Sequence, residues 1–151
     1  TCTCGGKAWA CLAALGGGKI RDGLYGWHVE VEPSGCIVNA LECGWFGAVD
    51  KYVFGYEECE FREGRSMWCL LGCEGGGFFR GRFYSARMCY AEAVKQDPSD
   101  ALAWLYLGQE KGGSIFGGRW ACYQKARHLS RDFDRICALA ECRNPLKCSL
   151  H

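Results

Sequence analysis

The side chains of this chain that could most readily react or bind a metal are its cysteines, which number 13 among 151 residues. No two of them have the Cys-x2-Cys spacing that a zinc ribbon or finger requires. One interpretation makes most of them core thiols, because free Cys is among the most buried residue types. A second interpretation makes them disulfides of an exported protein. The cysteine content therefore fits both an intracellular and a secreted protein. A third is a metal site formed by residues near the two ends, Cys2, Cys4, Cys142, Cys148 and His151.

Catalytic motifs are missing from the sequence. It contains no G-x-S-x-G, H-E-x-x-H or Walker pattern. Its histidines, His28, His128 and His151, do not have metal-ligand spacing to one another. The acidic cluster at 57–60 is typical of a solvated helix face. We therefore expect a protein that is not an enzyme, with no catalytic residue, no bound metal and no cofactor, since nothing combines a nucleophile, a base and an orienting group.

Composition and charge narrow the class of partner. The chain is 49% hydrophobic and 23% charged, as a globular domain is, and its net charge of +1 argues against nucleic acid as the main partner. No apolar run reaches the roughly 18 residues of a membrane span. The charge is uneven, with +4 over 101–151 and −3 over 1–100. This asymmetry fits a surface for an acidic partner, head-to-tail stacking of copies, or a solvated terminal pair of helices.

The elements that must position any site are predicted to be helices. Apolar residues recur at helical spacing over 83–94, before Pro98, and again over 101–108, after it. Asp97 is the expected cap of the second segment, with Pro98 at its first helical position. Further amphipathic segments are expected at 119–129 and at 132–142, the last as a terminal capping helix. The spacing predicts that strand is nearly absent.

Internal repetition organises these helices. The pattern Trp-x2-Leu-Gly occurs at 68–72 and again at 104–108, 36 residues later. The pattern Tyr-x2-Ala occurs at 90–93 and again at 123–126, 33 residues later. A period of this length indicates a repeated pair of elements. The small residues let two helices approach closely and the bulky ones fill the space beside them, so we expect both kinds to be buried at helix contacts.

These residues resemble the tetratricopeptide repeat (TPR), a pair of antiparallel helices of about 34 residues. The match is close from Ala86 to Gly108 and strong over 68–130. The resemblance implies an all-α fold in which helix pairs stack as an α-solenoid. It implies about four repeats in a single domain, 1–151, with 131–151 as the C-terminal cap.

The resemblance also implies a function. Such proteins are non-catalytic scaffolds that bind a peptide or helix of a partner protein in a groove lined by the first helix of each pair. The alternative function is a structural building block of a larger assembly or filament, formed by end-to-end packing. By their offsets in the motif, the residues expected to line the groove are Leu102, Leu105, Gln109, Ser66, Cys69 and Cys73.

Two further expectations concern departures from the pattern. Gly clusters at 16–18, 75–77 and 117–118 predict lengthened turns between helices. The first helix, expected near 7–15, is apolar nearly all round, and such a helix should be buried. We therefore expect self-association or partner binding through this helix, with Trp9 and Leu12 as anchors.

Overall fold

The computed structural model describes residues 3–14, 18–21, 28–47, 65–110, 117–140, 142 and 144–148. Most of these residues are helical, as the periodicity predicts. The expectations for Gly16 and Gly17, for the acidic cluster at 57–60 and for Cys2 and His151 lie outside the described residues. The helices are α1 (Thr3–Ala14), α2 (Pro33–Glu42), α3 (Met67–Cys73), α4 (Ala86–Gln96), α5 (Ala101–Gln109), α6 (Arg119–Leu129), α7 (Phe133–Leu139) and α8 (Pro145–Cys148).

Two antiparallel hairpins correct the all-α expectation. One joins α1 to α2 and consists of β1 (Gly18–Arg21) and β2 (His28–Val31). The other joins α3 to α4 and consists of β3 (Gly77–Phe79) and β4 (Arg82–Tyr84). Its two-residue turn has positive φ at Arg80 (51°) and Gly81 (78°), which is the backbone that tight hairpin turns need. The prediction that strand is nearly absent is therefore wrong.

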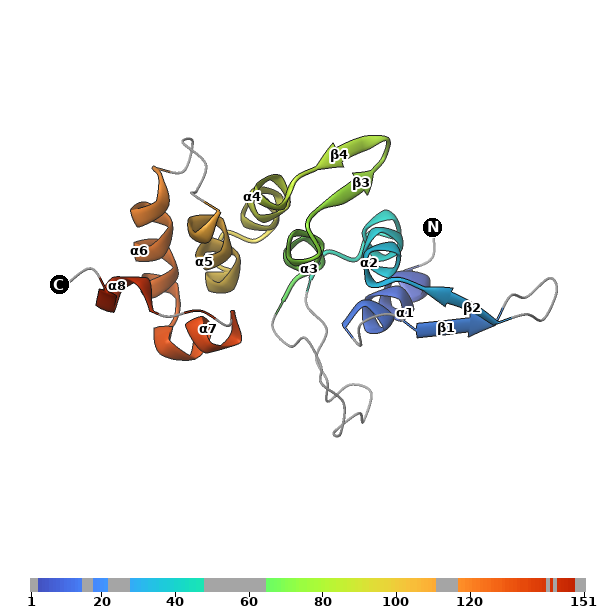
Figure 1. Ribbon diagram of the computed structural model, residues 1–151, viewed down its shortest axis with the longest axis horizontal. Coiled ribbons are helices and arrows are strands. Elements are labelled where there is room, and N and C mark those ends of the chain that lie inside the picture. The colour runs from blue at the N-terminus through green and yellow to red at the C-terminus, as the bar shows by residue number, and fades with distance from the viewer. Residues whose placement is uncertain are drawn as a thin grey trace.

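The helices follow one another in a row along the long axis of the molecule (Figure 1). Helices α1 and α2 pack together, as do α3 and α4, and α5 and α6. Contacts of α2 with α3 and of α4 with α5 join successive pairs, and α7 packs against α5. Each helix thus contacts elements near it in the sequence.

The same close contact recurs inside two of the helix pairs. A Cβ atom added to Gly72 of α3 would overlap the ring of Tyr90 in α4. A Cβ atom added to Gly108 of α5 would lie 2.5 Å from Cε1 of Tyr123 in α6. Both helix crossings are therefore tight enough to require glycine on one side and a tyrosine ring on the other. The repeated Gly and Tyr of the sequence form equivalent contacts.

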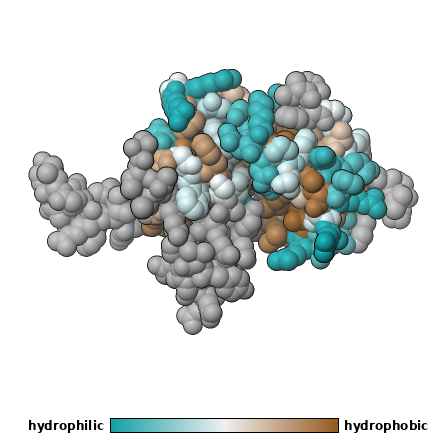
Figure 2. All heavy atoms as spheres, turned by 180° about the vertical axis from the view of Figure 1, so that it is seen from behind, coloured by the Kyte–Doolittle hydropathy of each residue, from teal (hydrophilic) through white to brown (hydrophobic). Residues whose placement is uncertain are grey.

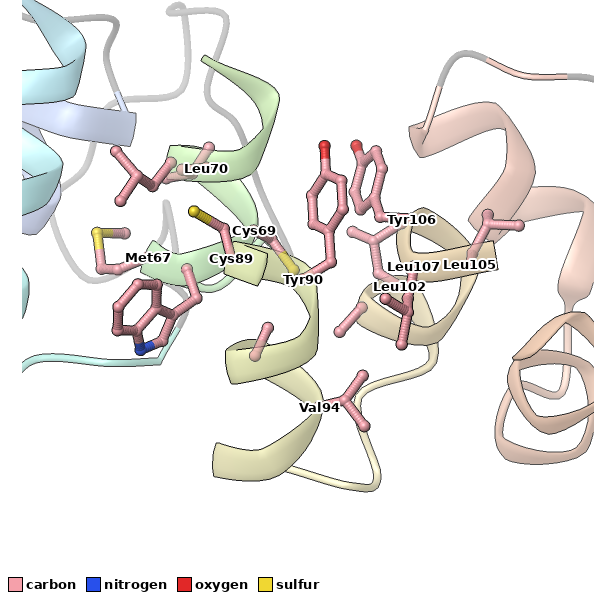
Figure 3. Close-up of a cluster of buried hydrophobic side chains, with 14 of the residues drawn as sticks. Met67, Cys69, Leu70, Cys89, Tyr90, Val94, Leu102, Leu105, Tyr106 and Leu107 are labelled. Atoms are coloured by element: carbon pink, nitrogen blue, oxygen red, sulfur yellow. The ribbon is translucent and has the colours of Figure 1, made fainter. Parts of the chain in front are cut away.

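The core runs through these crossings (Figure 3). Tyr90, Ala93 and Trp104 are buried, as predicted. Residues 101–108 of α5 are buried on every side, which explains why this helix is apolar all round. Tyr90 and Tyr106 stack with ring centroids 5.1 Å apart and an interplanar angle of 11°. Within the described part of the chain, the most deeply buried side chains are aliphatic, aromatic or sulfur-containing groups.

Three local expectations need correction. Phe83 belongs to β4 and is exposed, although its spacing from Ala86 fits a helix face. The N-cap of α5 is Asp100 rather than Asp97, and Pro98 lies in the preceding turn. Helix α1 begins at Thr3, four residues before the expected start.

The C-terminal part agrees better with expectation. Helix α6 has the predicted bounds, and α7 forms within the segment expected to cap the chain. Oδ1 of Asp132 accepts a hydrogen bond from the backbone N–H of Arg135 at 3.1 Å, which caps α7.

Candidate functional site

A cavity of about 540 Å³ lies at the C-terminal end of α4. This volume lies within the roughly 300–1,000 Å³ of ligand pockets. The start of α3, the α4–α5 turn, the start of α5 and one face of α7 enclose it. Its lining is Phe46, Gly47, Ser66, Trp68, Ala93, Gln96, Asp97, Ser99, Asp100, Ala101, Leu102, Ile136 and Leu139.

Helix caps give this cavity its polar edge. The Ser66 hydroxyl accepts a hydrogen bond from the Cys69 N–H at 3.3 Å and begins α3. Oδ1 of Asp100 accepts from the Ala103 N–H at 3.2 Å and begins α5. Because Ser and Asp are favoured N-caps, the side chains that start the helices also border the cavity.

The turn between α4 and α5 supplies a second carboxylate. Oδ1 of Asp97 accepts hydrogen bonds from the N–H of Ser99 at 3.1 Å and from its hydroxyl at 2.5 Å. This arrangement is typical of Asp in tight turns. The carboxylate of Asp97 is therefore held beside that of Asp100.

The cavity is electrostatically unbalanced. Burial raises the pKa of Asp100, and the nearby charge of Asp97 raises it further. No described cation forms an ion pair with either carboxylate; the described pair of this region, Lys95 with Glu92 at 3.5 Å, lies apart from them on α4. A ligand that brought a positive charge here would stabilise both carboxylates.

Trp68, which lines the cavity, has an indole N–H that lacks a partner. Nε1 of Trp68 is buried and has no hydrogen-bond acceptor. At the equivalent position of the next helix pair, Nε1 of Trp104 donates to the carbonyl oxygen of Pro98 at 2.8 Å. A buried donor without a partner is costly, so the Trp68 indole differs from its counterpart in having an unsatisfied N–H.

The structure separates the residues predicted to line a groove. Ser66 and Leu102 both line the cavity, although Leu102 is largely buried. Leu105 and Cys69 are fully buried in the core. Cys73 is exposed. Gln109 is half-buried at the end of α5. Burial raises the pKa of the Cys142 thiol, and a hydrogen bond with Gln109 opposes part of this shift.

Cys73 instead belongs to a small polar cluster on the surface. The Tyr90 hydroxyl donates to its Sγ at 3.8 Å, and the hydroxyls of Tyr90 and Tyr106 point in the same direction (Figure 3). Burial and the neighbouring thiol raise the pKa of both tyrosines. The Arg65 guanidinium lies over the Tyr106 ring, 5.8 Å from its centroid. These contacts join α3, α4 and α5 at the surface.

The self-association anchors lie against the core. Trp9 and Leu12 are half-buried and pack on it, while Ala10 and Ala13 of the same helix are fully buried. Helix α2 covers one face of α1. The apolar character of α1 is thus partly explained by packing within the chain.

A third copy of one repeat element lies in α2. The sequence Cys-Tyr-x2-Ala at 89–93 and 122–126 has a counterpart in Cys-Ile-x2-Ala at 36–40. In α2, α4 and α6 alike, the Cys and the Ala are buried. The signal was present in the sequence, but the aromatic residue is replaced by Ile37, so a search for Tyr-x2-Ala misses it.

Thiol accessibility is a direct test of this arrangement. We expect an alkylating reagent to modify Cys73 much faster than Cys69 in the native protein, because burial and the charge of Asp100 raise the pKa of Cys69 and so suppress its thiolate. Both cysteines lie in one tryptic peptide, 66–80, so tandem mass spectrometry compares them directly. Equal rates in folded protein would contradict the burial of Cys69, and unfolded protein provides the reference for equal reactivity.

Among the described residues, no group of three or more His, Cys, Asp or Glu side chains is arranged to hold a metal ion. Within the same part of the chain, no helix has the length and apolar character needed to cross a membrane.

Comparison with known proteins gives no family for this chain. No family model, no curated protein sequence and no solved structure matches it.

Proposed function

We propose that this protein is a non-catalytic interaction module that binds a peptide or helix of a partner protein in the cavity at the end of α4. The observation that carries the proposal is the composition of the cavity lining. Apolar side chains such as Leu102 and Ile136 form its walls, while the carboxylates of Asp97 and Asp100 have no described cation. The lining therefore offers apolar contact and two fixed charges, as peptide-binding sites do.

The unpartnered indole of Trp68 supports a polypeptide ligand in particular. Its N–H can accept no bond and can only donate one. A main-chain carbonyl is the acceptor that Trp104 uses in the equivalent place. A bound peptide would supply such a carbonyl to Trp68.

The repeated helix pairs support a TPR-like architecture for this module. The equivalent contacts of Gly72 with Tyr90 and of Gly108 with Tyr123 are what stacked copies of one helix pair would produce. We propose on this basis that the chain is a single domain whose pairs stack as an α-solenoid, with α7 beginning its cap.

The experiment is selection from a random peptide library with the folded protein. The affinities of the selected peptides are then measured by fluorescence anisotropy. The cavity variant Asp97→Asn/Asp100→Asn removes both charges but keeps oxygen atoms that can accept the turn and cap hydrogen bonds. We expect it to bind selected peptides about tenfold more weakly.

A matched control isolates the cavity. Trp120 is 53% exposed in α6 and does not line the cavity, so Trp120→Ser should leave affinity unchanged. A library that yields no binding peptide, or peptides that bind wild type and cavity variant equally, would contradict the proposed function.

The second candidate function, a building block of a larger assembly, is favoured by one specific observation. Phe78 and Phe83 form an exposed aromatic pair on the β3–β4 hairpin. Exposed apolar clusters mark interaction surfaces, and this one lies away from the cavity.

A further inference from the structure

The β3–β4 hairpin presents two phenylalanines to solvent. Phe78 is 67% exposed and Phe83 49% exposed. They face each other across the two strands, with ring centroids 5.2 Å apart. Such a pair on a surface gains free energy when another molecule covers it.

The opposite face of the hairpin anchors it to the core. The rings of Phe79 and Tyr84 lie 5.3 and 5.0 Å from the ring of Trp68, centroid to centroid. The exposed pair is therefore held on a supported strand pair, so little conformational entropy is lost when it binds.

Two arginines give the hairpin a positive tip. Arg80 and Arg82 are exposed, and their guanidinium carbons lie 4.9 Å from the Phe79 ring centroid and 5.4 Å from that of Tyr84. Within the described part of the chain neither forms an ion pair. Arginine and aromatic residues together are typical of interface hot spots.

The hairpin and the cavity lie at opposite ends of α4. Strand β4 directly precedes this helix, whereas Ala93, Gln96 and Asp97 at its other end line the cavity. Eleven helical residues span about 16 Å. In Figure 1 the hairpin projects from one edge of the molecule and α7 lies at the other. The hairpin of one molecule therefore cannot enter that molecule's own cavity.

We propose that the β3–β4 hairpin of one copy docks into the α4-end cavity of a second copy. The inference rests on the proposed function, because it names the occupant of the same cavity. Phe78 and Phe83 meet the apolar walls, and Arg80 and Arg82 meet the carboxylates of Asp97 and Asp100. A carbonyl of the hairpin backbone accepts the hydrogen bond of the Trp68 indole. The hairpin thus carries complements to three unsatisfied features of the cavity, with the Phe78–Phe83 pair on one face of its strands and the arginines over the Phe79 and Tyr84 rings of the other.

The proposed contact joins two different surfaces. In a docked pair, one copy therefore keeps a free cavity and the other keeps a free hairpin. Contacts of this kind produce open chains of copies, or rings where the rotation closes. Figure 2 shows hydrophobic residues framed by hydrophilic ones on the rear of the molecule, over its C-terminal helices.

The test is sedimentation velocity of purified full chain from low to high micromolar concentration. We expect wild-type protein to form species larger than a dimer as concentration rises. The hairpin variant Phe78→Thr/Phe83→Thr keeps residues that favour strands, and we expect it to associate at least about tenfold more weakly. The cavity variant Asp97→Asn/Asp100→Asn should lose association to a similar degree.

Mixing the two variants gives the decisive result. The hairpin variant keeps its cavity and the cavity variant keeps its hairpin, so an equimolar mixture should form a one-to-one dimer and nothing larger. A second hairpin variant, Arg80→Asn/Arg82→Gln, removes both positive charges and should still form the turn, because Asn-Gly is the preferred sequence of a two-residue hairpin turn. Trp120→Ser, which removes a different exposed aromatic, should assemble like wild type.

Several outcomes would overturn the proposal. They are a wild-type chain that stays monomeric throughout, variants that associate as wild type does, and a mixture that does not pair. Vesicles of phosphatidylcholine and phosphatidylserine test a membrane as the occupant: binding that needs Phe78 and Phe83, by a chain that stays monomeric, would assign the hairpin to lipid. Library peptides that bind the cavity of a monomeric chain would overturn this inference and leave the proposed function intact.

Discussion

Replacing Trp104 with alanine is expected to lower the free energy of unfolding by about 3–5 kcal/mol. The side chain is largely buried at the start of α5, and its Nε1 donates to the Pro98 carbonyl at 2.8 Å. Alanine removes the packing and leaves that carbonyl without its donor. Because a domain of this size is stable by roughly 5–15 kcal/mol in total, urea denaturation followed by circular dichroism should show a large shift of the midpoint.

Two comparisons separate packing from hydrogen bonding. Trp104→Phe loses the hydrogen bond to Pro98, whereas Trp68→Phe removes an indole N–H that has no acceptor. The first should therefore be the more destabilising, although both tryptophans are largely buried. Trp120→Ala, at an exposed site, should change stability by less than about 1 kcal/mol. Equal effects at all three positions would contradict the described core.

The helices could be predicted from the sequence because their signals are local. The bounds of α6 agree with the predicted segment 119–129, where Tyr123 and Ala126 recur at helical spacing. The small and aromatic residues of the repeated motif lie at real helix crossings, such as Gly108 against Tyr123. Spacing of three or four residues reports directly which side of a helix is buried.

The hairpins could not be predicted by the same argument. Phe83 stands three residues before Ala86, a spacing that suits a helix face, yet it lies in a strand and faces solvent. Three-residue strands are too short for alternation to be evident. The turn depends on Arg80 in a left-handed conformation, which few residues other than Gly, Asn and Asp adopt.

The cavity could not be predicted from the sequence for a different reason. Its walls come from α3, α4, α5 and α7, so Trp68 and Ile136 meet across 68 positions of sequence. Offsets within one repeat placed Ser66 and Leu102 in the predicted groove, and both residues line the cavity. They could not indicate Leu139, because no spacing within a helix reports how far-separated helices are arranged.

Alanine at Gly72 or Gly108 is expected to lower the free energy of unfolding by about 1–3 kcal/mol. Helix propensity alone predicts the reverse, because alanine is favoured over glycine by about 1 kcal/mol within a helix. At both positions the added Cβ would overlap a tyrosine ring, that of Tyr90 or of Tyr123. The two helices of a pair would have to separate, which would loosen the surrounding core. Thermal and urea unfolding of both variants measure the effect.

The control for this prediction is Gly47→Ala. Nothing lies within 4 Å of a Cβ built at Gly47, and its φ is ordinary, so this change should be neutral or slightly stabilising. A double-mutant cycle then locates the strain. Tyr123→Ala destabilises on its own by removing the ring, but it should reduce the further cost of Gly108→Ala, because the ring atoms that the new Cβ would meet are gone. Additive effects of the two changes would show that Gly108 does not contact Tyr123, and would remove the structural basis for equating the two helix pairs.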